Sequence, residues 1–203
     1  QRYAEDVCFT FASLILVISK EEADILHKEY NINLKIIYII GRIVEPCFQN
    51  IRFEISEDIT LSKIFTLYKD STALESYEWW NKSAFCYIGR MADYKGIKEI
   101  LSAWEILYNK HHEKTPPLWL LGGNVDDIST YRKAVLSYVP SLMKYENEHK
   151  IYWWGYSTSE GLATILSKCS VMIMHSAFEP GGRVMLEAFA TGTPRPFQVL
   201  CKR

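Results

Sequence analysis

Several features that would assign this 203-residue sequence to a functional class are missing from it. There is no Gly-x-Ser-x-Gly, no P-loop and no zinc motif. The cysteines are odd in number, scattered and without a Cys-x-x-Cys pair: Cys8, Cys47, Cys86, Cys169 and Cys201. A disulfide framework or a zinc site is therefore not expected, and we expect a reducing, cytosolic setting.

Long apolar runs and long runs of one charge are also absent. The apolar run over residues 9–18 is about half a membrane span and suits a core segment better, so we expect no transmembrane segment and see no signal peptide. Any membrane contact would be peripheral and made by the full-length protein. The net charge of -1 gives no sign of a nucleic-acid groove or a polybasic membrane patch.

What is present is material for a folded core, because 48% of the residues are hydrophobic and 14% are aromatic. The length fits one large domain, or one domain and part of another. The chain starts and stops within its pattern, so we interpret it as a piece of a longer protein.

Apolar segments alternate regularly with amphipathic ones. Residues 14–19, a helix over residues 21–30 and residues 34–40 predict one strand–helix–strand unit. Residues 51–82 have no strong period and are interpreted as a hinge. Further strands are expected at 85–89, 117–122, 150–154 and 171–175, with helices at 97–108, 129–147 (broken at Pro140), 159–166 and about 182–190. The alternation predicts an α/β fold: a Rossmann-like parallel sheet with flanking helices, which binds ligands beyond the carboxyl ends of its strands.

Two loops at such strand ends contain candidate binding residues. Arg90 and Lys95 flank a loop that opens a helix, and both side chains suit phosphate; the alternative is a solvated loop with two charges. Gly122 and Gly123 follow the next strand, where they permit close approach of a ligand or form a simple turn.

A third candidate region follows the strand that ends at His175. Glu179 lies in a Gly-rich turn, and Glu187 is the only polar residue of an apolar helix that we expect to be buried nearly all round. The helix begins at Gly181-Gly182, so its free N–H groups form an anion site. The alternatives are a structural ion pair for Glu187 and a surface position for Glu179. His175, alone and without partners at ligand spacing, is interpreted as a core or edge residue.

Together these residues resemble the nucleotide-sugar-dependent glycosyltransferases of the GT-B fold, family 4. Gly89-Arg90…Lys95-Gly96 resembles the family's GR…KG loop, Glu179-x7-Glu187 resembles its E-x7-E motif, and Ala190-Thr-Gly-Thr-Pro194 follows as in the family. Residues 17–44 are similar to the end of its N-terminal domain. The resemblance covers most of residues 14–48 and 84–198.

The resemblance implies a role for each candidate. The catalytic residues would be Arg90, Lys95 and Glu179: Arg90 and Lys95 would hold the donor diphosphate and stabilise the charge of the leaving nucleotide, and Glu179 would contact the donor sugar hydroxyls. Glu187 would accept hydrogen bonds from the ribose hydroxyls. The remaining donor-binding residues would be Gly89, Gly122, Gly123, Gly182, Arg183 and Val184, the last three through N–H groups that face the phosphates. The family transfers sugar with retention, without a metal or other cofactor, to a hydroxyl acceptor on a glycan, lipid or small molecule.

The implied organisation is the tail of an acceptor-side domain in residues 1–50, the hinge in 51–82, and an incomplete donor-binding domain in 83–203. Gly181-Gly182 replaces the family's Phe-Gly, and residues 195–203 do not resemble its next strand. We expect this chain alone to bind donor weakly and not to turn over. Two alternatives are a nucleotide-sugar epimerase of the same fold and a non-catalytic binding module.

Overall fold

The computed structural model describes residues 8–9, 11–49, 83–177, 182–193 and 197–198. They form two compact units, the first consisting mainly of Gln1–Ile43 and the second mainly of Val44–Phe178 and Val184–Arg203. The hinge predicted over residues 51–82 lies outside the described residues, so it stays a prediction.

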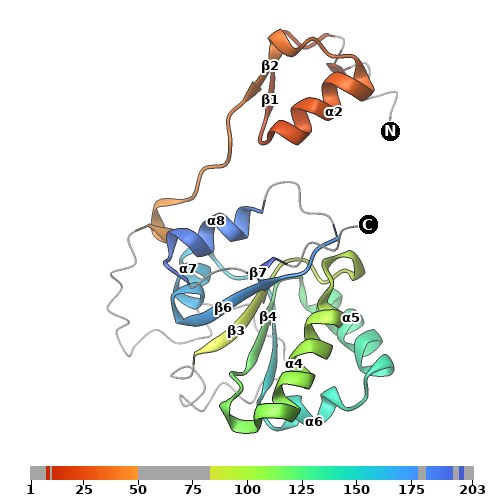
Figure 1. The fold of residues 1–203 in the computed structure, drawn as a ribbon, viewed down its shortest axis with the longest axis vertical. Coiled ribbons are helices and arrows are strands. Elements are labelled where there is room, and N and C mark those ends of the chain that lie inside the picture. The colour runs from red at the N-terminus through yellow and green to blue at the C-terminus, as the bar shows by residue number, and fades with distance from the viewer. Residues whose placement is uncertain (1–7, 10, 50–82, 178–181, 194–196, 199–203) are drawn as a thin grey trace. The chain divides into compact units, whose positions relative to one another are not determined.

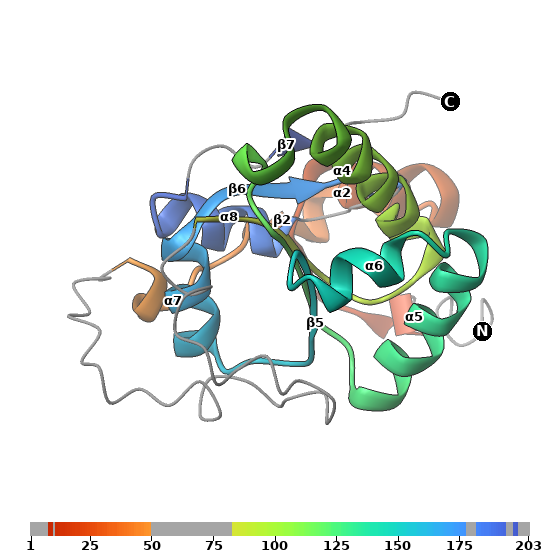
Figure 2. The ribbon, with the colours of Figure 1, turned by 90° about the horizontal axis from the view of Figure 1, so that it is seen from below.

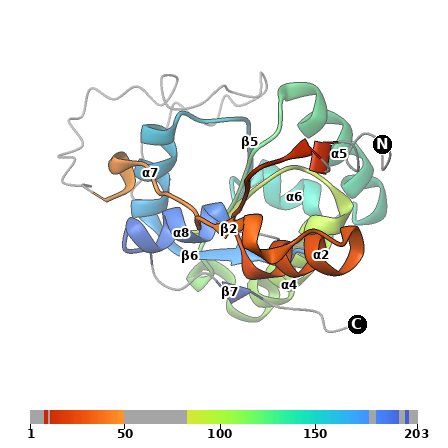
Figure 3. The ribbon, with the colours of Figure 1, turned by 90° about the horizontal axis from the view of Figure 1, so that it is seen from above.

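The first unit is the predicted strand–helix–strand. Strands β1 (Ile15–Val17) and β2 (Ile37–Ile39) pair in parallel, and helix α2 (Lys20–Tyr30) lies beside them (Figure 3). Ser19 begins the helix, because its hydroxyl oxygen accepts a hydrogen bond from the Glu22 N–H at 3.2 Å. Ser19, the last residue of the apolar segment 14–19, therefore determines where the helix starts.

The second strand of this unit is shorter than the sequence predicts. Leu34–Ile36 forms a 3₁₀ turn, η1, although its residues are apolar like those of the strand that follows. The Asn33 side-chain oxygen accepts a hydrogen bond from the Lys35 N–H at 2.9 Å. This local side-chain bond favours the turn over an extended chain, so the predicted strand start at residue 34 is wrong.

The second unit contains a five-stranded parallel sheet in the order β5-β4-β3-β6-β7 (Figure 1). Its strands are β3 (Ala84–Ile88), β4 (Leu118–Leu121), β5 (Ile151–Trp154), β6 (Cys169–Met174) and β7 (Phe197–Gln198). The predicted parallel α/β fold is confirmed. The chain runs outward from β3 to β5 and then returns to the other side of β3. The strand order therefore reverses between β3 and β6, which is where open α/β sheets bind ligands.

Helices cover both faces of this sheet. Helices α4 (Ile97–His111), α5 (Val125–Tyr138) and α6 (Leu142–Asn147) lie on one face, and α7 (Ser159–Lys168) and α8 (Arg183–Ala190) lie on the other (Figures 1 and 2). The side chains of β3 alternate between two cores. Cys86 and Ile88 pack with Ala163 and Ala188, whereas Tyr87 packs with Ile97 and its neighbours on α4. Both faces of the strand are thus buried.

Of two predictions for the helical region after β4, one is confirmed and one needs correction. The expected break at Pro140 is present, because α5 ends at Tyr138 and α6 begins at Leu142. The start expected at Ser129 is wrong, since α5 begins at Val125. The Asn124 side-chain oxygen accepts from the Asp127 N–H at 2.8 Å and caps the helix four residues earlier.

The segment after α8 also differs from expectation. Residues 195–203 do not resemble the family's next strand, but Phe197–Gln198 forms the short strand β7, which pairs in parallel with Ile173 and Met174 of β6. A two-residue strand gives almost no sequence pattern, and it is recognised here only by its pairing.

The cysteines of the described residues, Cys8, Cys47, Cys86 and Cys169, are free thiols. Cys86 and Cys169 are buried in one core. Burial, together with a hydrogen bond to Cys169, raises the pKa of the Cys86 thiol well above its usual value. A thiol in this setting stays protonated and is inert.

Candidate functional site

The loop that follows β3 is held by the strand that leads into it. The hydroxyl of Tyr87, a residue only 1% exposed, donates a hydrogen bond to the Arg90 carbonyl at 2.8 Å. A Cβ atom at Gly89 would lie 2.7 Å from that hydroxyl oxygen. Glycine at this position therefore leaves the space that the Tyr87 hydroxyl occupies. The backbone of Arg90 is therefore fixed by a buried side chain.

The loop brings the two predicted cations to one aromatic ring. The 3₁₀ turn η4 (Asp93–Lys95) places Tyr94 between them. The Lys95 ammonium lies 5.2 Å and the Arg90 guanidinium carbon 5.8 Å from the ring centroid, and Arg90 Nη2 donates to the Tyr94 hydroxyl at 2.5 Å. The sequence reasoning missed Tyr94, although an aromatic residue between two cations in a loop was a signal for it.

The same loop is attached to the segment that follows β6. The Ala177 N–H donates to the Tyr94 carbonyl at 2.8 Å. Gly96 has φ +67° and packs against His175, where a Cβ atom would lie 2.6 Å from the His175 Cδ2. His175 is thus half-buried at a strand end, and its backbone and ring form the surface on which the Lys95-Gly96 turn rests. The segments that follow β3 and β6, the two strands between which the sheet order reverses, are therefore in direct contact.

An ion pair at the edge of the loop offsets the charge of Asp93. Lys98 Nζ lies 2.9 Å from the Asp93 carboxylate, and this hydrogen bond lowers the pKa of the Asp93 carboxyl below its usual value. The acid in the loop is therefore matched by a separate lysine, and Arg90 and Lys95 give the loop a positive balance.

The glycines after β4 let two strand ends meet. Gly122 has φ +117° and Gly123 φ +88°, both conformations that side chains rarely adopt. A Cβ atom at Gly122 would collide with the Gly89 carbonyl, while the Gly89 N–H donates to the Leu121 carbonyl at 2.9 Å. The observed close approach is between two backbone segments of this chain. It places Gly122 and Gly123 beside the loop of residues 89–96, which contains Arg90 and Lys95 and is called the cation loop below.

We expect Gly122→Ala to lower the free energy of unfolding by about 2–4 kcal/mol, because backbone strain and the collision with Gly89 add together. The matched control is Gly192→Ala, which has φ +72° but meets nothing within 4 Å. That control isolates the strain and should cost about 1–2 kcal/mol. Urea unfolding followed by circular dichroism measures both; equal losses would show that the contact with Gly89 has no energetic weight.

Helix α8 buries its acid and exposes part of its apolar surface. Glu187 is 3% exposed, whereas Leu186 is 36% and Phe189 is 55% exposed. The expected burial of Glu187 is therefore confirmed, whereas the expectation that the helix is buried nearly all round is wrong. The apolar run did not show which face of the helix would be buried. Ala188 packs in the core, and its neighbour Glu187 is buried as well.

The carboxyl end of α8 is fixed firmly. Gly192 has φ +72°, the Thr193 N–H donates to the Ala188 carbonyl at 3.0 Å and the Gly192 N–H to the Phe189 carbonyl at 3.1 Å. These bonds form a Schellman motif. The Thr193 hydroxyl also donates to the Leu166 carbonyl at 2.7 Å, which attaches the helix end to α7. Glu187 is thus carried on a rigidly held helix.

The amino end of α8 was predicted nearly correctly. The helix begins at Arg183, one residue after Gly182, which has φ +45°. Arg183 is exposed and Val184 is half-buried against the core of the second unit. Glu179 lies outside the described residues. The roles of all four residues toward a donor stay predictions.

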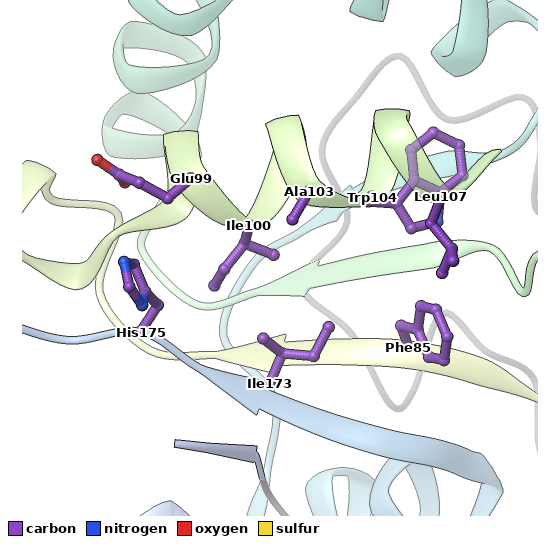
Figure 4. A pocket seen from close by; sticks show the side chains of 8 residues that line it. All are labelled: Phe85, Glu99, Ile100, Ala103, Trp104, Leu107, Ile173 and His175. Carbon is purple, nitrogen blue, oxygen red and sulfur yellow. The ribbon is translucent and has the colours of Figure 1, made fainter. Parts of the chain in front are cut away.

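A separate apolar pocket lies between α4 and the sheet (Figure 4). Its volume is about 320 Å³, and Glu99 and His175 stand together at one end of it. The rest of the lining is apolar: Phe85, Ile100, Ala103, Trp104, Leu107 and Ile173. None of these residues was a site candidate, and this lining does not suit a diphosphate.

In residues 8–9, 11–49, 83–177, 182–193 and 197–198, no group of three or more His, Cys, Asp or Glu side chains could hold a metal ion. No helix within those ranges has the length and apolar character needed to cross a bilayer.

Two known proteins have sequences similar to this chain. Mannosylfructose-phosphate synthase from Agrobacterium fabrum is 24% identical over 191 residues, which are 94% of this chain and 38% of that protein. The uncharacterized glycosyltransferase MJ1607 from Methanocaldococcus jannaschii is 28% identical over 108 residues, 53% of this chain and 25% of that protein. The chain thus spans well under half the length of these relatives.

Solved structures share the fold. Alr3699/HepE from Anabaena, in complex with UDP and glucose, superposes with a TM-score of 0.66 at 18% identity, covering 98% of this chain and 47% of that one. Sucrose-phosphate synthase from Thermosynechococcus elongatus gives a TM-score of 0.60 at 20% identity, covering 94% and 41%. The sequence pattern of the family Glycosyl transferases group 1 matches residues 76–195, which is more than half of the chain and includes both cations and both acids of the proposed motifs. This chain belongs to the group 1 glycosyl transferases.

Proposed function

We propose that this chain supplies the donor-binding part of a retaining glycosyltransferase of family 4. The parent enzyme would transfer a sugar from a nucleoside-diphosphate donor to a hydroxyl acceptor. The observation that carries the proposal is the pair Arg90 and Lys95 held around Tyr94, at the point where the sheet order reverses. Such a cation pair suits a diphosphate, and the position is the usual ligand site of an open α/β sheet.

The other roles follow from the motifs. Glu187 would accept hydrogen bonds from the ribose hydroxyls, and Glu179 would contact the donor sugar. Gly89, Gly122 and Gly123 would contact the nucleotide through their backbone at the ends of β3 and β4, and the N–H groups of Gly182, Arg183 and Val184 would face its phosphates. The complexes of Alr3699/HepE with UDP and with UDP-glucose support a uridine donor as the first to test.

The proposed chemistry requires no metal ion. Charge on the departing nucleotide diphosphate would be stabilised by Arg90, Lys95 and the helix amino end. A divalent cation would then be redundant. Metal independence is a proposal that a chelator tests directly.

The experiment is a calorimetric titration of the chain with UDP, GDP and ADP and with their glucose conjugates, with and without EDTA. We expect saturable binding of one base over the others and no effect of EDTA. Glu187→Ala should weaken binding of the preferred nucleotide about tenfold, because a buried carboxylate–hydroxyl interaction is lost. Asp126→Ala, an exposed acid in the first turn of α5, is the matched control.

Three results would count against the proposal. If none of the six ligands bound, the proposed donor site would be contradicted. Unchanged affinity in Glu187→Ala would favour a binding module that uses different residues. Isomerisation of the bound nucleotide sugar without an acceptor, detected by proton NMR, would favour the epimerase alternative.

A further inference from the structure

Tyr94 occupies the centre of the cation loop without having been assigned a role. It is 41% exposed, so its ring is accessible from solvent. The ring lies near the charged groups of both Arg90 and Lys95, and its hydroxyl accepts a hydrogen bond from Arg90. An aromatic face attracts a cation through its quadrupole, and here one ring contacts two cations.

The arrangement addresses an electrostatic problem of any diphosphate site. Two cations that must act on one anion repel each other while the anion is absent, and long side chains can separate in solvent. A ring that attracts both offsets part of this repulsion. It also restricts the two side chains before binding, which lowers the entropy that binding would otherwise cost.

The backbone of Tyr94 explains why its ring stays in place. Its carbonyl accepts the hydrogen bond from the Ala177 N–H, and the following turn closes through the bonds Lys95 N–H to Ala92 and Gly96 N–H to Asp93, both at 3.0 Å. Gly96 then rests on His175. The residue is thus anchored through its main chain to the segment after β6, and its side chain remains available for the cations.

We propose that Tyr94 is a positioning residue for the donor diphosphate: its ring gathers Arg90 and Lys95 into one anion-binding pair, and its hydroxyl holds Arg90 until a phosphate oxygen replaces it. This inference rests on the proposed function. The ring and the hydroxyl of Tyr94 have different roles. The ring contributes to affinity in the bound state, and the hydroxyl contributes only in the free state.

The test is calorimetric binding of UDP and of inorganic pyrophosphate to the wild type and to Tyr94→Leu and Tyr94→Phe. Tyr94→Leu removes the ring and should weaken both ligands about fivefold to tenfold. Tyr94→Phe keeps the ring and should bind within about twofold of the wild type, since a phosphate displaces the hydroxyl in any case. Thermal unfolding should be nearly unchanged in both variants, because the bond from Ala177 is to the backbone.

Tyr138→Leu is the matched control. Tyr138 is also exposed, and the Lys98 ammonium lies 4.9 Å from its ring centroid, so the substitution removes a similar contact outside the cation loop. It should leave both affinities unchanged.

The outcomes separate this inference from the proposed function. If the wild type binds neither UDP nor pyrophosphate, the proposed function fails and the inference fails with it. If the wild type binds and Tyr94→Leu binds equally well or more tightly, the inference alone is overturned. If Tyr94→Phe weakened binding of both ligands as much as Tyr94→Leu, the inference would be overturned, because the effect would come from the hydroxyl and not from the ring.

Discussion

Replacing both Arg90 and Lys95 with alanine is expected to weaken UDP binding at least about 100-fold. Each cation would make charge-assisted hydrogen bonds to the diphosphate worth about 1.5–3 kcal/mol, and each 1.4 kcal/mol is tenfold in affinity. The two side chains lie at one ring, so both can act on the same anion. Calorimetry with UDP measures the loss.

The control for this double variant is Lys110→Ala with Lys133→Ala. Both lysines are exposed, on α4 and α5, and their removal changes the net charge by the same amount. The control should bind UDP like the wild type at physiological ionic strength, where charges more than about 8 Å away are screened. If both double variants lost affinity equally, the effect would come from overall charge and Arg90 and Lys95 would not form the diphosphate site.

Replacing Glu146 with alanine is expected to destabilise the second unit by about 3–5 kcal/mol. Glu146, whose side chain is 9% exposed, joins three elements. It accepts hydrogen bonds from Arg132 Nε on α5, at 3.0 and 3.1 Å, and from Trp153 Nε1 on β5 at 2.6 Å, and it forms an ion pair with Arg132 Nη2. Alanine removes the acceptor from a half-buried guanidinium and an indole N–H together.

Thermal unfolding followed by circular dichroism checks this result, and we expect the midpoint to fall by about 10 °C. The control is Glu148→Ala, two residues further on, where the exposed carboxylate lies 3.8 Å from Lys144. An exposed pair of this kind contributes about 0–1 kcal/mol. A midpoint in Glu146→Ala as high as that of Glu148→Ala would mean that the network around Glu146 does not stabilise the fold.

The regular elements were predictable where local pattern and burial agree. Residues 118–121 and 151–154 are apolar runs, and each is a strand buried on both faces. Ser19 and Pro140 mark a helix start and a helix break through chemistry that acts within a few residues. At Asn33 and Asn124 the same kind of local bond sets an element boundary that differs from the predicted one, because the asparagine side chain accepts a backbone N–H bond there.

The candidate site was predictable as a set of residues and unpredictable as an arrangement. Arg90 and Lys95 were identified from a motif in one loop, and the structure brings them to one ring. The direction in which Glu187 points could not be read from a run of apolar residues, since any face of such a helix could have been buried. Glu179 lies outside the described residues, and its role stays a prediction.

The sequence by itself determined the alternation of strands and helices, the parallel sheet and the family, because these depend on periodicity and on motifs within short segments. Only the tertiary structure decided which strand ends are neighbours, that Gly96 rests on His175, and that Gly122 lies against Gly89. Those contacts join residues far apart in the chain, so they depend on crossovers and packing that no local pattern specifies. The placement of Tyr94 between two cations has the same origin, since its backbone is held by the Ala177 N–H from another strand end.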